Sequence, residues 1–414
     1  MNILTCACAA AMLCSWATAD FQGLVLDANI VSPGGDIPFR VEFEELPNDE
    51  IGAWLVNGAE RTRVPKVDVT DDGFVLHWDY YDAKIEATIS EIPGDVRHTV
   101  AGTWTKRRNA TEWATMKLSG TLLWPEAQQA APVRGDTRSP VAGRWAMQFA
   151  QEQERSILLL EGPPPGEAAN VLNGTVLTTT GDYRHLQGRL MDDRLVLTTF
   201  DAGHVMLFKA TLRPDGTLAG DFWSGPSFHD TWTAQKDDRV TLPDPFSLSK
   251  FVATPEQLDA LSFPDHTGAM RSLSEFAGKP RLFEIWGTWC PNCKDATPLL
   301  AELHERYAGK GLSIVSLAFE VTGDPERDRA QVNTYRERFN VPYPMLIAGM
   351  RGKEPAQKAF PILDQIRAYP TFIFIDATGK VRAVYTGFTG PAAPREHERL
   401  KESFDRLVRE MLPG

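Results

Sequence analysis

Two cysteines separated by two residues, Cys290 and Cys293, form the part of this sequence best suited to chemistry. Thiols at this spacing can close a disulfide within one turn, and a thiolate can exchange with another disulfide. An apolar run, 281–286, predicts a buried strand before the pair, and a helix is expected from 293 to 307. Unpaired N–H groups at a helix N-terminus favour a thiolate. We therefore expect Cys290 to be the attacking sulfur, accessible just outside the helix, and Cys293 to be the resolving sulfur.

Metal binding is the other common use of closely spaced cysteines. A closed zinc site needs four ligands, and the sequence offers neither a second pair at this spacing nor a histidine close by. Redox chemistry is therefore favoured, with no metal and no cofactor.

The N-terminal residues 1–19 are predicted to be a signal peptide. The apolar run 3–16 is too short to span a bilayer, and Ala17-Thr18-Ala19 is a small-residue cleavage site. A wrongly assigned start codon is the alternative. Cleavage would remove three of the five cysteines and leave only Cys290 and Cys293. A secreted chain with one such pair has no disulfide scaffold, so the pattern predicts a periplasmic or other extracytoplasmic protein whose cysteines serve chemistry.

The sequence around the cysteines resembles the thioredoxin superfamily, and most of all its periplasmic TlpA/ResA-like thiol–disulfide oxidoreductases. The resemblance covers roughly 261–414. It rests on Trp289-Cys290-Pro291-Asn292-Cys293-Lys294, on Glu284 six residues before Cys290, on Pro298 within the helix, and on Tyr369-Pro370-Thr371 followed by an apolar strand.

The resemblance implies roles for individual residues. Glu284 would be a buried acid that takes the proton from Cys293, although the family usually carries aspartate there and the longer side chain changes the reach; a solvent-facing Glu284 is the alternative. A cis peptide bond is implied before Pro370. Substrate contacts are implied for Trp289, Pro291, Tyr369 and Pro370. Several ResA-like proteins have a glutamate where this chain has Ala296, so no role of that carboxylate is carried over.

Length and composition predict a soluble, multidomain protein. The chain has 414 residues, 24% charged and 43% hydrophobic, with a net charge of −12. This charge argues against nucleic acid as a partner. The expected organisation is a signal peptide (1–19), a first β module (20–122), a linker (123–141), a second β module (142–240), a connector (241–260) and a thioredoxin-like α/β domain (261–414).

Short alternating runs broken by turn residues predict antiparallel β structure in the N-terminal half, either barrel or sandwich. Two patterns recur about 120 residues apart and suggest a tandem duplication. The segment 72–78 is echoed by 193–199, and 101–104 with 112–115 is echoed by 219–222 with 231–234. The histidines here show no metal-ligand spacing. The best use for this region is to dock a partner or present a substrate.

Strand, helix and strand patterns predict the α/β domain. Runs 281–286 and 312–319 flank the helix 293–307, which indicates a parallel crossover unit. Further helices are expected at 324–339 and 395–411, with a terminal hairpin at 371–376 and 381–386. Segment 348–365 is expected to be an insert of variable content.

The leading hypothesis is an extracytoplasmic thiol–disulfide oxidoreductase that acts on protein disulfides. The resemblance implies the reducing direction and a membrane electron donor. One alternative is a thiol peroxidase of peroxiredoxin type, but the threonine that such enzymes carry three residues before the cysteine is replaced here by Gly287. The other is a β-rich binding protein with an accessory redox domain.

Overall fold

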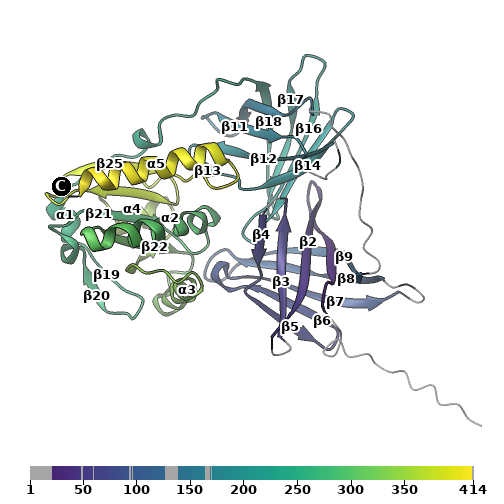
Figure 1. The fold of residues 1–414 in the computed structure, drawn as a ribbon, viewed down its shortest axis with the longest axis horizontal. Helices are drawn as coiled ribbons and strands as arrows, with labels where there is room; N and C mark the ends of the chain where they lie inside the picture. The colour runs from purple at the N-terminus through teal and green to yellow at the C-terminus, as the bar shows by residue number, and fades with distance from the viewer. Residues whose placement is uncertain are drawn as a thin grey trace, which may run out of the picture.

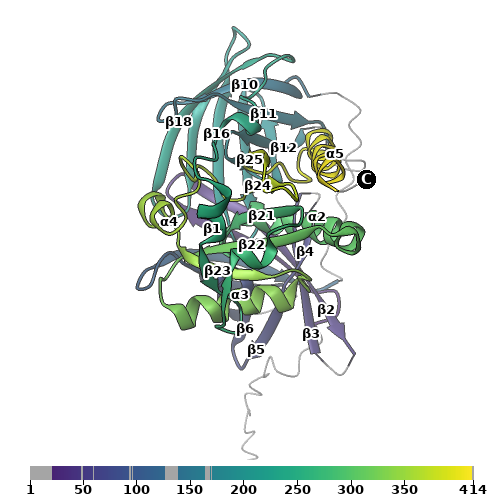
Figure 2. The same ribbon diagram turned by 90° about the vertical axis from the view of Figure 1, so that its left-hand side faces the viewer.

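The structure, a computed structural model, describes residues 21–412 except 48–49, 59, 93–94, 96, 126–138, 164–167 and 169. Two antiparallel β modules lie one beside the other, and an α/β domain packs against both (Figures 1 and 2). The expected antiparallel N-terminal region and C-terminal α/β domain are thus confirmed. The expected signal peptide (1–19) and most of the expected linker (123–141) lie outside the described residues.

The first β module is a nine-stranded sheet in the described part of the chain. Its first and last strands pair with each other, and the sheet stays open between β4 and β5. Alternate side chains of β2, for example Phe39, Val41 and Phe43, are buried in its core. The strands are β1 (Val25–Ser32), β2 (Gly35–Leu46), β3 (Glu50–Asn57), β4 (Glu60–Arg63), β5 (Lys66–Thr70), β6 (Gly73–Trp78), β7 (Ala83–Glu91), β8 (Arg97–Arg107) and β9 (Trp113–Leu123), with the 3₁₀ helix η2 (Asp79–Tyr81) after β6.

The second β module repeats this up-and-down order and closes into a barrel. Its first and last strands pair, and β11 pairs with both β10 and β12, which leaves no open edge there. The strands are β10 (Gly143–Phe149), β11 (Ser156–Glu161), β12 (Val171–Thr178), β13 (Gly181–Asp182), β14 (Leu186–Met191), β15 (Arg194–Phe200), β16 (Val205–Leu212), β17 (Leu218–Ser224) and β18 (Phe228–Lys236).

The segments that echo each other in the sequence occupy equivalent strands. Segments 72–78 and 193–199 fall on β6 and β15, each the fourth strand from the end of its module. In the second echo, β8 corresponds to β17 and β9 corresponds to β18. These are the last two strands of each module. The shared order supports the proposal of a tandem duplication.

The α/β domain is built on a five-stranded sheet of order β23-β22-β21-β24-β25. β21 and β22 are parallel neighbours, as the crossover pattern predicted, whereas β24 and β25 run antiparallel. Its elements, with those that lead into it, are η4 (Pro245–Ser247), α1 (Pro255–Asp259), β19 (Ser262–Pro264), β20 (Met270–Ser272), η5 (Leu273–Phe276), β21 (Arg281–Trp286), α2 (Pro291–Tyr307), η6 (Ala308–Lys310), β22 (Ser313–Glu320), α3 (Pro325–Arg338), β23 (Met345–Met350), α4 (Lys353–Ala359), β24 (Thr371–Ile375), β25 (Val381–Thr386) and α5 (Pro394–Met411).

Helices cover both faces of this sheet. Leu282 and Trp286 of β21 pack in one core with α2, α3 and α5, whereas Phe283 and Ile285 pack in another with α1 and α4. Glu284 therefore points to the face covered by α2, because side chains alternate along a strand.

The expected start of the helix after the first cysteine needs correction. Helix α2 begins at Pro291 rather than at Cys293, with Cys290 as its N-cap, because a proline at the first helical position lacks only an N–H that would have no partner there. The segment 348–365, expected to be an insert, contains the end of β23 and the short helix α4, whose Ala356 is buried.

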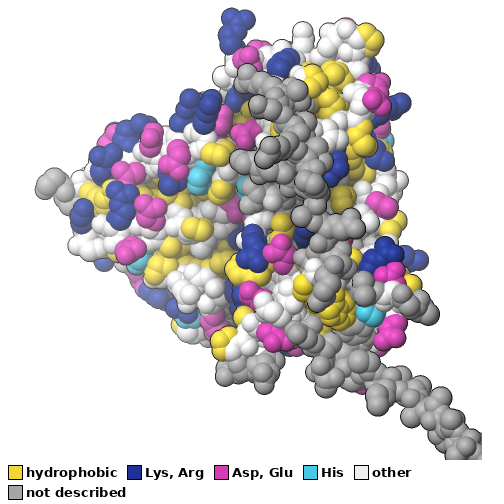
Figure 3. Space-filling model, turned by 45° about the vertical axis from the view of Figure 1, so that its right-hand side comes forward, with side chains coloured by type: hydrophobic (Ala, Val, Ile, Leu, Met, Phe, Trp, Pro, Cys, Tyr) yellow, Lys and Arg dark blue, Asp and Glu magenta, His cyan; other side chains and the backbone are white. Residues whose placement is uncertain are grey.

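The surface mixes both signs of charge. On the face in Figure 3, basic and acidic side chains alternate over the β modules and the α/β domain, so the net charge of −12 is not gathered there into one patch. Ion pairs also cross the domain boundary. Arg338 pairs with Asp79 at 2.8 Å, and Arg367 pairs with Glu154 at 2.7 Å.

Candidate active site

The two cysteines lie where β21 passes into α2. The backbone N–H of Cys290 donates to the carbonyl oxygen of Gly287 at 3.1 Å, and the N–H of Lys294 donates to that of Cys290 at 3.2 Å, which is the first turn of the helix. The two thiols are free. The thiol of Cys290 donates to the carbonyl oxygen of Tyr369 at 3.3 Å, so the turn that carries Pro370 lies directly against it.

The accessibility expected for Cys290 is wrong for this arrangement. Only 6% of Cys290 is exposed, and Cys293 is fully buried. The position outside the helix is as expected, but other parts of the chain cover it. This cover shields the sulfur from a folded substrate protein.

Glu284 is buried beneath the helix, as predicted. It is 1% exposed, and the hydroxyl of Ser316 on the neighbouring strand donates to its Oε2 at 2.5 Å. Its Oε1 has no hydrogen-bond partner among the described residues. Burial raises the pKa of Glu284 to about 8. Burial also raises the pKa of the Cys293 thiol well above its usual value, and the nearby Cys290 and Glu284 raise it further.

The interaction between Glu284 and Cys293 predicts the effect of Glu284→Gln on the release of a mixed disulfide and on stability. At neutral pH Glu284 holds its proton, and as pH rises through about 8 it becomes a base facing Cys293. We expect the glutamine variant to release a mixed disulfide roughly 100-fold more slowly, the usual scale for loss of a positioned base. Because the pKa in the folded protein is higher than in the unfolded chain, Glu284 lowers the stability of the wild type as pH rises from about 4 through 8.

Two measurements check this prediction. Urea unfolding across this pH range is expected to show the wild type losing stability relative to Glu284→Gln. Stopped-flow release of a mixed disulfide is expected to slow in that variant. The matched control is Glu302→Gln, which changes an exposed glutamate on α2. Equal release rates in Glu284→Gln and the wild type would remove Glu284 from the proton transfer.

A second buried carboxylate, Glu320, holds the turn before the cysteines. Both the N–H and the hydroxyl of Thr288 donate to it, at 2.8 and 2.7 Å. Burial raises the pKa of Glu320 to about 7. Sequence reasoning missed this residue, although an acid at the end of the apolar run 312–319 was the available signal.

The residues expected to contact a substrate gather around Cys290. The ring of Trp289 packs edge-on against Tyr369 at 5.2 Å, and its indole N–H donates to the carbonyl oxygen of Phe319 at 2.9 Å. The peptide bond between Tyr369 and Pro370 is cis, as the resemblance implied. Pro291 is buried under residues of the β modules.

Loops from both β modules form the cover over the cysteines. Lys106, at the end of β8, donates from Nζ to the carbonyl oxygens of Trp289 at 3.0 Å and Gly203 at 2.9 Å. A Cβ at Gly203 would lie 2.7 Å from the ring of Pro291, so only glycine allows this close approach. The side-chain amide of Asn292 donates to the carbonyl oxygen of Asp182 at 3.1 Å. Every residue from Trp289 to Asn292 thus contacts a β module or lies beneath one.

Arg184 anchors this cover. Its guanidinium is fully buried and pairs with Glu60 of the first β module, with Asp201 of the second at 2.6 Å, and with Asp295 of α2. Burial alone would lower the pKa of Arg184, but the three carboxylates outweigh it and raise that pKa well above its usual value. Sequence reasoning missed Arg184 and Lys106, because no local motif marks either one.

Within the described residues, no group of three or more histidine, cysteine, aspartate or glutamate residues could hold a metal ion. No helix in the same part of the chain is long and apolar enough to cross a membrane.

Comparison with known proteins indicates the class of the C-terminal domain. The model of the AhpC/TSA family matches residues 255–384. The C-terminal region therefore carries a thioredoxin-like domain of AhpC/TSA type, and several of the proteins that it resembles are named thiol-disulfide oxidoreductases.

The individual relatives are similar over about a third of the chain. Thioredoxin-like protein YneN of Bacillus subtilis (strain 168) is 26% identical over 132 residues, which are 32% of this chain and 71% of YneN. Thiol-disulfide oxidoreductase ResA of Geobacillus thermodenitrificans is 29% identical over 123 residues, which are 30% of this chain and 63% of ResA. The chain therefore spans less than two thirds of the length of that ResA.

Solved structures of similar proteins also cover only part of the chain. A thiol:disulfide interchange protein of the thioredoxin family from Chlorobium tepidum TLS is 25% identical, with a TM-score of 0.30, over 40% of this chain and 98% of its own.

Proposed function

We propose that this protein is an extracytoplasmic thiol–disulfide oxidoreductase that reduces protein disulfides through Cys290 and Cys293. The observation that carries the proposal is the arrangement of the two thiols: one is the N-cap of α2, beside the turn at Pro370, and the other faces the buried acid Glu284. The segment 1–19 and the cysteine count support the location. A membrane electron donor would return the pair to the dithiol state.

The exchange runs in two steps that balance in atoms and electrons. The Cys290 thiolate attacks one sulfur of the substrate disulfide, that S–S bond breaks, and the first substrate thiolate leaves and takes a proton. Cys293 passes its proton to Glu284 in its carboxylate form, then attacks the Cys290 sulfur and releases the second substrate thiol. The substrate gains two electrons, and the protein ends as the Cys290–Cys293 disulfide.

A stoichiometric test separates this proposal from its alternatives. Reduced protein is incubated with a disulfide-linked peptide, and the thiols are alkylated and mapped by mass spectrometry. We expect two substrate thiols for each Cys290–Cys293 disulfide formed. Substrate thiols appearing while both cysteines remain alkylatable would exclude the mechanism. Faster oxidation by hydrogen peroxide than by the peptide would favour the thiol peroxidase.

The direction follows from the reduction potential of the pair, measured by equilibration with dithiothreitol buffers. A reductant of this fold is expected near roughly −270 mV, whereas a value near about −120 mV would indicate an oxidant. The peroxidase alternative lacks its threonine, because Gly287 lies three residues before Cys290. A Cβ at Gly287 would lie 2.2 Å from the indole nitrogen of Trp289, which leaves no room for that threonine here.

A further inference from the structure

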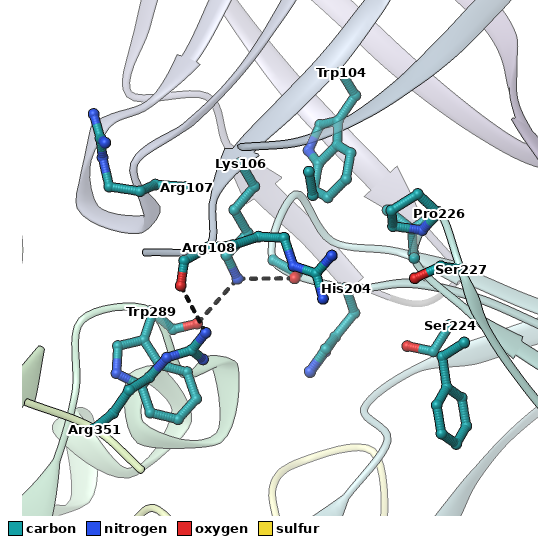
Figure 4. Close-up of a pocket in the computed structure, with 15 residues that line it drawn as sticks. Trp104, Lys106, Arg107, Arg108, His204, Ser224, Pro226, Ser227, Trp289 and Arg351 are labelled. Atoms are coloured by element: carbon teal, nitrogen blue, oxygen red, sulfur yellow. Dashed lines mark hydrogen bonds between the residues drawn. The ribbon is translucent and has the colours of Figure 1, made fainter. Parts of the chain in front are cut away.

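A cationic pocket lies beside the active-site tryptophan, where the two β modules meet the α/β domain. Its volume is about 320 Å³, within the range of small-ligand pockets. Figure 4 shows that its walls come from all three parts of the chain. The lining residues that matter most are Lys106 and Arg108 of the first module, Phe228 of the second, and Trp289 and Arg351 of the α/β domain.

The positive charges of this pocket form no direct ion pair in the described part of the chain, although Asp201 interacts with Lys106 and Glu320 with Arg351 from further away. Lys106 donates only to carbonyl oxygens, and Arg351 donates to the carbonyl oxygen of Arg108 at 2.9 Å and stacks 4.6 Å over the ring of Trp289. Among the described residues, neither of these side chains nor Arg108 forms an ion pair with a carboxylate. The adjacent Arg107, by contrast, pairs with Asp82 at 2.5 Å. In a chain of net charge −12, three neighbouring basic side chains that form no direct ion pair among the described residues indicate an anionic ligand.

The pocket also adjoins the reacting sulfur. Trp289 lines it and directly precedes Cys290 in the chain. The charges of Lys106 and Arg351 both interact with Cys290. A group bound in the pocket would therefore lie next to the sulfur that we propose attacks the substrate.

We propose that this pocket binds carboxylate groups that flank the disulfide of the substrate, so that the protein prefers acidic disulfides. The inference rests on the proposed function and names its substrate class. Basic side chains would hold the carboxylates, and Trp289 and Phe228, which is 45% exposed, offer apolar walls for the rest of the ligand. A small carboxylated disulfide and an acidic polypeptide segment share this chemistry.

The test compares two disulfide-linked dimers that differ only in charge, made from Ac-Glu-Cys-Glu-NH2 and Ac-Gln-Cys-Gln-NH2. Single-turnover reduction by the dithiol protein is measured, and each rate constant is divided by that of the same dimer with dithiothreitol, which removes intrinsic differences in reactivity. At low ionic strength we expect the normalised rate constant of the Glu dimer to be about tenfold higher. The preference is expected to shrink in high salt, which screens the charges.

Variants assign the preference to the pocket. Arg108→Gln and Arg351→Gln are each expected to lower the Glu-to-Gln ratio several-fold. Arg213→Gln, which removes an exposed arginine outside the pocket, is expected to keep the ratio. Oxidised glutathione distinguishes a small carboxylated disulfide from an acidic polypeptide segment as the ligand. If the protein reduces glutathione disulfide and this depends on Arg108, small disulfides bind in the pocket. If it does not, the ligand is an acidic polypeptide segment.

A binding measurement keeps this inference separate from the redox mechanism. Ac-Glu-Ala-Glu-NH2, which has no sulfur, is titrated into the Cys290→Ser protein and followed by tryptophan fluorescence. Binding that Arg108→Gln weakens supports the pocket even if neither dimer is reduced, in which case the proposed function fails. Equal rates for both dimers together with no binding of this peptide would overturn the pocket, even if both dimers are reduced.

Discussion

Cys290→Ser is expected to abolish reduction of a disulfide-linked peptide, lowering the rate constant by roughly three orders of magnitude or more, the scale on which loss of a nucleophile acts. A hydroxyl cannot form the mixed disulfide, and Cys293 cannot replace Cys290 as the attacking group. Cys293 is fully buried, and its raised pKa keeps it as a thiol at neutral pH. The measurement is single-turnover release of substrate thiols from the reduced protein.

The matched variant is Cys293→Ser, because it removes the other thiol by the same substitution. It is expected to stop after the first step and to accumulate a mixed disulfide between Cys290 and one substrate peptide, visible by mass spectrometry. A Cys290→Ser protein that still releases substrate thiols at a rate near that of the wild type would refute the assigned order of attack.

Much of the α/β domain was predictable because its signals are local. The strand at 281–286 and the helices after Asp324 and before Met411 appear in the structure within a residue or two of their expected bounds. The burial of Glu284 and the cis bond before Pro370 also followed from short motifs. In each case the residues that allow the prediction lie in the same segment of the chain as the predicted feature.

The cover over Cys290 could not be predicted in this way. The contact between Lys106 and Trp289 joins residues 183 apart in the sequence, and the one between Arg184 and Glu60 joins residues 124 apart. A lysine at the end of a strand has no pattern that tells a buried ammonium from an exposed one. Alternating apolar and polar residues predicted β structure in the N-terminal half. Which residues its loops cover depends on how the modules pack against the α/β domain.

Through this cover, the β modules affect the chemistry of Cys290. Burial lowers the pKa of Lys106 to about 8, so it is charged at neutral pH while it holds the backbone beside Cys290. Arg184 draws carboxylates from both modules and from α2 into one cluster. Removing one partner from such a buried cluster costs about 3–5 kcal/mol. The cluster therefore favours the covered arrangement, and access to the sulfur depends on the equilibrium between covered and open states.

Gly203→Val is expected to open the site and to speed alkylation of Cys290 by iodoacetamide. The first added carbon would lie 2.7 Å from the ring of Pro291 and 3.1 Å from Tyr81, both of which are buried. Overpacking of this kind costs about 1–3 kcal/mol. Each kcal/mol favours the open state roughly fivefold. We therefore expect alkylation to be faster by about five- to 100-fold, with a similar gain in the reduction of insulin, a folded substrate.

The control is Gly162→Val, in the same module, where an added carbon meets none of the described residues within 4 Å. It is expected to alkylate at the wild-type rate. Far-UV circular dichroism and the urea midpoint of the α/β domain separate opening of the cover from unfolding. Gly203→Val is expected to leave both near their wild-type values. Unchanged alkylation in a folded Gly203→Val protein would mean that the loops from the β modules do not limit access, and that the sulfur is reached by another route. The pocket between Lys106, Arg108 and Arg351 would then be the first candidate for that route, since it adjoins Trp289 without displacement of Gly203.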